Sequence, residues 1–135
     1  MLVLNPRQVT FGSATWGNVA SVSIGRTSNK LLAEWSDEGA HVVLADVPEQ
    51  LVTVRVVQEM LGDDMDTPKP GESGELTFTT GANSSDAATR EVTIASAVVR
   101  TVSYETSTSR GSRRYIELIA VSSNGTTDPV SVDDA

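Results

Sequence analysis

With 135 residues, the chain is long enough for one domain with a real core and too short for two. It has no cysteine, which excludes disulfides, thiolate nucleophiles and zinc–thiolate sites and leaves the redox compartment open. The formal net charge of −8 argues against a nucleic-acid binder that gains affinity by neutralising phosphates, but not against a protein that lets nucleic acid pass without binding it.

The amino-terminal segment, residues 1–17, starts with a short apolar run and then holds Phe11 and Trp16. It lacks the basic stretch and long apolar run of a signal peptide, and no apolar run in the chain reaches the roughly 20 residues of a membrane span. We therefore expect a protein made in the cytoplasm without a membrane partner. Its two aromatic side chains should lie against the core or against a neighbouring subunit.

Three short strands are predicted next, over residues 19–24, 30–35 and 41–46. Residues 25–29 and 36–39 are rich in turn-forming side chains and are expected to separate the strands.

Residues 47–62 fit two structures. Asp46 as N-cap, Pro48 in the first turn and Gly62 as C-cap would suit one short helix. The run from Val52 to Val57 is mostly β-branched, and such side chains lose entropy in a helix. A strand over residues 51–59 is therefore the preferred prediction.

A long acidic loop is predicted over residues 60–74, followed by a strand over 75–80 and a polar turn over 81–89. Loops longer than about 12 residues are usually functional or disordered. Between residues 59 and 75 there are six acids and one base, and these acids are our candidate functional residues in this part of the chain: Glu59, Asp63, Asp64, Asp66, Glu72 and Glu75.

The longest pattern in the chain is a β-hairpin over residues 90–122. Residues 106–111 interrupt two stretches of period-2 alternation, which indicates strands with one buried face on either side of a turn. The far end is marked by the turn pairs Asn124-Gly125 and Asp128-Pro129. The apolar positions of the first strand are Val92, Ile94, Val98, Val102 and Tyr104.

The whole chain therefore reads as all-β, a sandwich or barrel with a long central loop and two terminal arms, residues 1–17 and 124–135. Few residues offer chemistry. His41 is the only histidine, so no histidine acid–base pair exists, and the acids of the central loop lack the spacing of a calcium-binding loop. We expect no enzyme activity, no cofactor and no metal.

The arginines are unevenly placed: five of the ten bases lie between residues 90 and 114. Two interpretations remain open. The charge either solubilises a monomer, or the arginines of one subunit meet the acids of the next. Arg100 interrupts the apolar face of its strand, so a carboxylate partner is expected nearby. The candidate subunit interface consists of Trp16, Arg100, Arg110, Arg113 and Arg114.

The carboxy-terminal stretch VSSNGTTDPVSV resembles the end of phage major tail proteins, the subunits of the tail tube. Residues 122–129, Ser-Ser-Asn-Gly-Thr-Thr-Asp-Pro, match the strand-ending turn of that family, with Asn124 where aspartate is usual. The alternation of strands and the central loop are also similar, so the likeness is close over about 30 residues and loose over most of the chain.

The resemblance implies a virion tail protein whose copies form stacked hexameric rings around a lumen for DNA. Neighbouring sheets would join edge to edge, and a helix would pack on the sheet. The central loop would reach the adjacent ring, so the six acids at residues 59–75 would lie at the contact between rings or line the lumen. A tape measure protein, and in some phages a sheath, would be further partners. The alternatives are another tail component, such as a terminator or hub, and a carbohydrate-binding sandwich, which would need an exposed aromatic platform from Trp16, Trp35, Tyr104 and Tyr115.

Overall fold

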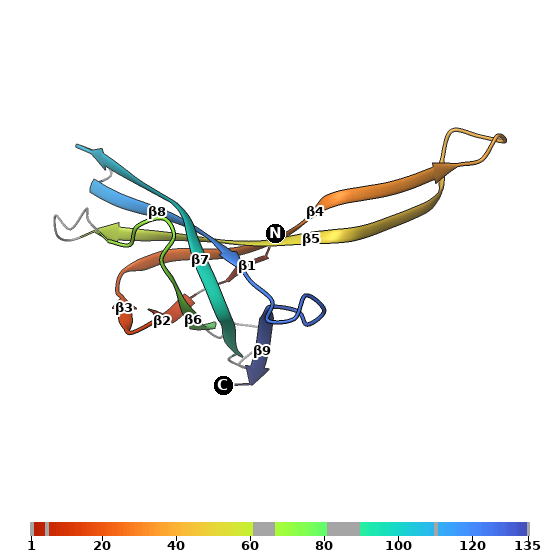
Figure 1. Ribbon diagram of the computed structural model, residues 1–135. Helices are drawn as coiled ribbons and strands as arrows, with labels where there is room; N and C mark the ends of the chain where they lie inside the picture. The colour runs from red at the N-terminus through yellow and green to blue at the C-terminus, as the bar shows by residue number, and fades with distance from the viewer. Residues whose placement is uncertain (1, 5, 61–66, 81–89, 110, 135) are drawn as a thin grey trace.

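The computed structural model describes residues 2–4, 6–60, 67–80, 90–109 and 111–134 (Figure 1). Within this part of the chain there is no helix, and hence none long and apolar enough to cross a membrane. The strands, in chain order, are β1 (Leu2–Leu4), β2 (Pro6–Phe11), β3 (Ala14–Trp16), β4 (Val19–Trp35), β5 (Val42–Met60), β6 (Ser73–Thr80), β7 (Arg90–Ser107), β8 (Gly111–Ala120) and β9 (Val130–Asp134).

All strand pairs are antiparallel and belong to one sheet with the order β1–β4–β5–β8–β7–β6–β2–β3. β7 joins two parts of this sheet, since its first half pairs with both β6 and β9 and its second half pairs with β8. β2, close to one end of the order, also contacts β4 close to the other end, so the sheet curls back on itself. The all-β, sandwich- or barrel-like fold predicted from the sequence is confirmed.

The core lies inside the curled sheet and is built almost entirely from aliphatic side chains. Burying these groups is the main favourable contribution to folding. The largest fully buried side chains are Phe78, Leu76, Ile94, Ile116, Leu118, Val9, Val22, Val54, Val56 and Val99.

The amino-terminal aromatics belong to this core. Phe11 and Trp16, on the paired strands β2 and β3, are each 8% exposed, and their rings stack with centroids 5.2 Å apart. Of the two expected positions for this segment, the structure shows the one against the core of the same chain.

The long hairpin is confirmed as β7 and β8, with a shorter turn than expected, because Thr106 and Ser107 still pair with β8. The predicted inward face is right at both ends of β7, since Val102 also packs against the core, and wrong between them. Val92 and Ile94 are buried, but Ala97 and Val99 are buried in place of Val98. The cause is a bulge: β7 has one residue more than β6 between the pairs Leu76↔Ile94 and Gly74↔Ala97, which shifts the inward-facing parity.

The predicted turn at residues 25–29 is wrong. β4 runs through it without a break, pairing with β5 on both sides, and the extra residue is absorbed as a bulge between Ser28 and Lys30. The turn at 36–39 is confirmed, since β4 ends at Trp35 and β5 begins at Val42.

The choice between helix and strand over 47–62 is settled as strand for the residues up to Met60. β5 contains both predicted strands, 41–46 and 51–59, except that His41 lies just before it. Pro48 sits where β5 has an extra residue relative to β4, between the pairs Lys30↔Glu49 and Leu32↔Asp46, and bulges tolerate proline because no ladder hydrogen bond is needed there.

The carboxy-terminal arm expected at 124–135 is instead part of the sheet over its described residues from Val130 onwards. β9 pairs with the first half of β7, from Ile94↔Val130 to Arg90↔Asp134, and Val130 joins the core. The turn before it is tightly bonded: the side-chain oxygen Oδ1 of Asn124 accepts from the amides of Thr126 and Thr127 at 2.9 and 2.8 Å. Gly125 has φ +82°, as the turn pair predicted.

Candidate functional site

β4 and β5 extend well beyond the rest of the sheet. β5 pairs with β8 only from Thr53 to Met60, whereas it pairs with β4 as far as Trp35↔Val42. Residues 29–50, which we call the arm, therefore form a two-stranded ribbon that projects from the body, at the right of Figure 1. None of the buried core residues lies in the arm.

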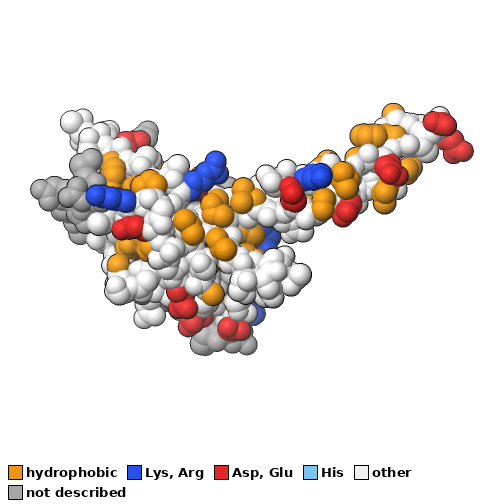
Figure 2. Space-filling view, viewed as in Figure 1, with side chains coloured by type: hydrophobic (Ala, Val, Ile, Leu, Met, Phe, Trp, Pro, Cys, Tyr) orange, Lys and Arg blue, Asp and Glu red, His pale blue; other side chains and the backbone are white. Residues whose placement is uncertain are grey.

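The arm carries most of the large hydrophobic side chains that the described surface exposes. They lie along it among acidic side chains (Figure 2). An isolated two-stranded hairpin is marginally stable in water, and each Val or Leu side chain contributes about 1.5–3 kcal/mol when it is fully buried. The exposed residues, with their exposed fractions, are Leu31 (59%), Leu32 (48%), Trp35 (59%), Val42 (45%), Val43 (65%) and Leu44 (52%).

Both faces of the arm are apolar in part. Leu31 and Trp35 share one face of β4 by alternation, and that face has no charged residue on β4 between them. The opposite face combines two leucines with two acids, because the register pairs Leu32 with Asp46 and Glu34 with Leu44. A ribbon of this kind is suited to being covered on two sides.

The arm is also strongly acidic. Between residues 29 and 50 there are five acids, Glu34, Asp37, Glu38, Asp46 and Glu49, and the single base Lys30, a net charge of −4. The net charge of the arm is therefore half of the net charge of the whole chain, which is −8.

A second exposed feature lies on the body. The solvent-facing side of β5, β8 and β7, which we call the outer face, carries an arginine–glutamate–arginine row. Arg55 Nε lies 3.3 Å from Glu117 Oε2, and Arg100 Nη1 lies 3.2 Å from Glu117 Oε1. Both arginine side chains are nearly three-fifths exposed, whereas Glu117 is 21% exposed.

The expected carboxylate partner of Arg100 is thus Glu117, within the chain. Arg100 does not face the core, because β7 has an extra residue relative to β8 between Val99 and Thr101, and this bulge turns the guanidinium towards solvent.

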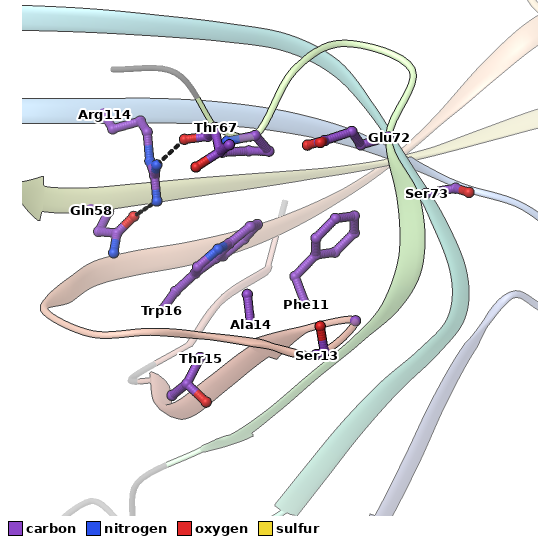
Figure 3. A pocket seen from close by; sticks show the side chains of 12 residues that line it. Phe11, Ser13, Ala14, Thr15, Trp16, Gln58, Thr67, Glu72, Ser73 and Arg114 are labelled. Carbon is purple, nitrogen blue, oxygen red and sulfur yellow. Dashed lines mark hydrogen bonds between the residues drawn. The ribbon is translucent and has the colours of Figure 1, made fainter. Parts of the chain in front are cut away.

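Two of the predicted interface residues are interior residues instead. Arg114 is 6% exposed and Trp16 is 8% exposed, so their side chains present little surface in the free chain. The Arg114 guanidinium donates to the backbone carbonyl of Thr67 and to Oε1 of Gln58, and lies 5.8 Å from the centre of the Trp16 ring (Figure 3). A cation over an indole face is a favourable arrangement when it is desolvated.

This cluster borders an open cavity of about 640 Å³. Glu72 is the one carboxylate among the described residues that line it, and no histidine lines it. Within the described part of the chain, moreover, no group of three or more acidic or histidine side chains could hold a metal ion.

The predicted acids and the remaining arginines are only partly described. Glu59 is exposed, and its Oε1 lies 3.9 Å from Nη2 of Arg113, its cross-strand neighbour. Glu72 accepts a hydrogen bond from the backbone amide of Lys69, and Glu75 is exposed on β6. Four of the candidates lie outside the described residues: Asp63, Asp64, Asp66 and Arg110.

The arm was not predictable as a projecting element from the sequence. A signal was present, since apolar residues at 31–35 and 42–44 flank a polar turn at 36–41. Both segments were interpreted as ordinary strands of the body, because nothing in their sequence shows that β8 stops pairing at Thr53.

Comparison with known proteins found no relative: no protein-family model matches the chain, and no curated protein matches it.

Proposed function

We propose that this protein is a structural subunit that assembles with copies of itself into stacked rings, as the tail tube subunits of phages do. The observation that carries the proposal is the arm. It holds six exposed large hydrophobic side chains on a ribbon that the rest of the chain leaves uncovered. Surfaces of this kind mark sites of protein association.

The distribution of these side chains favours a larger assembly over a closed pair. Hydrophobic residues lie on both faces of the arm, so one partner surface would cover only half of them. The edge strands of the arm also leave backbone groups that can pair with another chain. An arm held between two neighbours satisfies both needs, and repeated contacts of this kind build rings or filaments.

The charge is in keeping with a tube for DNA. A net charge of −8 repels phosphates, and exposed Glu59, Glu72 and Glu75 add to this repulsion wherever they face a lumen. The turn at residues 122–129, which carries the resemblance to phage major tail proteins, is an ordered structural turn held by Ser122 and Asn124.

The alternative of a carbohydrate-binding module receives less support. It needs several aromatic rings on one exposed surface, but Trp16 is buried and Trp35 is on the arm, far along β4 from the body. Among the described residues, the aromatic side chains form no such platform.

The test is negative-stain electron microscopy together with sedimentation at increasing protein concentration, with and without the tail initiator complex. We expect rings or tubes from the native chain and monomers from a variant in which Asn-Gly replaces residues 30–49. A native chain that stays monomeric at every concentration, also with the initiator complex, would overturn the proposal.

A further inference from the structure

We propose that the arm of one copy docks on the outer face of β5, β8 and β7 of a second copy, with Glu34 and Asp46 of the arm pairing with Arg55 and Arg100. The inference rests on the proposed function and specifies which two surfaces meet. It makes the contact heterologous, because the donor surface and the acceptor surface are different parts of the chain.

The acceptor is a sheet face whose apolar side chains the chain covers only in part. Two rows of side chains cross this face. In the first row, Val57 of β5 pairs with Tyr115 of β8. In the second row, Thr53 of β5 pairs with Ile119 of β8, which is opposite Val98 of β7. The apolar members of these rows are half-buried only.

The arginine row lies between these two apolar rows. In the register, Arg55 is opposite Glu117, and Glu117 is opposite Thr101 next to Arg100. One carboxylate therefore serves two exposed guanidinium groups, and the row retains a charge of +1. An arginine has five N–H donors, so each can bind a second carboxylate in addition to Glu117.

The donor is the face of the arm that mixes leucines and acids. Leu32 and Leu44 can pack on the apolar rows of the outer face, and Glu34 and Asp46 bring carboxylates to the arginine row. None of these four side chains is buried in the free chain. The two surfaces thus match in chemistry at both their apolar and their charged positions.

Charge also decides between this contact and a pairing of two arms. Each arm has a net charge of −4, so two arms laid together bring like charges into contact. An acidic arm on an arginine row brings opposite charges together, which favours a different surface of a second copy as the occupant.

The experiment exchanges the charges of the two surfaces in separate variants. The arm variant carries Glu34→Lys and Asp46→Lys, and the acceptor variant carries Arg55→Glu and Arg100→Glu. A matched control, Asp37→Lys with Glu38→Lys, changes the net charge as the arm variant does but lies in the turn at the tip of the arm. Circular dichroism and urea unfolding of each variant confirm that the monomer is folded.

Each exchanged variant alone should need at least about a tenfold higher protein concentration to sediment as an assembly, because like charges then face each other. An equal mixture of the two variants should assemble again, since both kinds of contact then join opposite charges. The tip control should assemble as the native chain does.

Two results would overturn the inference. If the native chain assembles and both exchanged variants do so at the same concentration, the outer face is not the acceptor, while the proposed function stands. If each variant fails alone and the mixture of two folded variants also fails, the two surfaces do not meet. Should the acceptor variant be unfolded, Arg55→Gln with Arg100→Gln replaces it, and a loss of assembly at unchanged stability is expected.

Discussion

Arg114 is a cation inside a protein whose core is otherwise apolar. Its guanidinium bonds to the Thr67 carbonyl and to Gln58 and lies over Trp16, so it links β8 to β5, to β3 and to the segment before β6. A buried charge is costly unless its donors are satisfied, and a side chain removed from such a network leaves acceptors without a partner. The residue is therefore expected to matter for stability rather than for assembly.

The first prediction compares neighbours in the sequence. Arg114→Ala should lower the free energy of unfolding by about 1–3 kcal/mol, because it removes two hydrogen bonds from a buried charged group and its contact with Trp16. Arg113→Ala, which removes a partly exposed ion pair with Glu59, should cost at most about 1 kcal/mol. Urea unfolding of dilute monomers measures both. Equal losses would contradict the structural role assigned to Arg114.

Asp128 gives a prediction about pH. The hydrogen bond from Arg26, and then the one from the Val130 amide, hold the pKa of this carboxyl below its ordinary value. A lowered pKa in the folded state means that the stabilisation is present at neutral pH and is lost as the pH falls below about 4 through the folded-state pKa.

Asp128→Asn should therefore be slightly less stable than the native chain at neutral pH, by at most about 1 kcal/mol since the pair is exposed. The difference between the two unfolding curves should disappear on acidification. A difference that persists unchanged at low pH would show that the charge of Asp128 contributes nothing.

At the scale of elements, the strands were largely predictable and the long-range arrangement was not. Alternation and β-branched runs located the strand segments, since both reflect local preferences of the chain. The bulges at Asn29, Pro48 and Ala95–Ser96 were not predictable, because each depends on the partner strand having fewer residues over the same length. For the same reason residues 25–29 were mistaken for a turn.

The candidate site shows the same division. That Arg100 requires a carboxylate partner could be predicted from its position in the strand pattern. The burial of Arg114 and Trp16 could not, because it depends on how β3, β5 and β8 pack together. The arm escaped prediction since its exposure is set by where β8 ends rather than by its own residues.

The arm should be dispensable for folding. The variant in which Asn-Gly replaces residues 30–49 retains all buried core residues, so its urea midpoint as a monomer should match that of the native chain within error. A large loss of stability would mean that the arm supports the body of its own chain.

The fluorescence of Trp35 can report whether the arm becomes buried. It is 59% exposed and Trp16 is buried, so burial of the arm should shift the tryptophan emission to shorter wavelength as the protein assembles. Trp35→Phe should remove this shift while Trp16 continues to report a buried ring. An emission spectrum independent of assembly would place Trp35 outside every contact.

At the scale of the whole molecule, the chain combines a body that is stable through its own core with a projecting ribbon that is not covered by it (Figures 1 and 2). The two parts have separate requirements. Folding depends on the curled sheet, whereas the proposed association would depend on the ribbon and on the surface that receives it.

The acidity of the ribbon has a consequence for the fate of a newly made subunit. Bare hydrophobic strands tend to stack without order, and carboxylates are among the devices that prevent this. Lowering the pH to the isoelectric point near 4.5 removes the net charge of the chain, so light scattering should then report disordered precipitate rather than the proposed rings or tubes. The Asn-Gly variant lacks the exposed hydrophobic strands of the arm, so its light scattering should not increase under the same conditions.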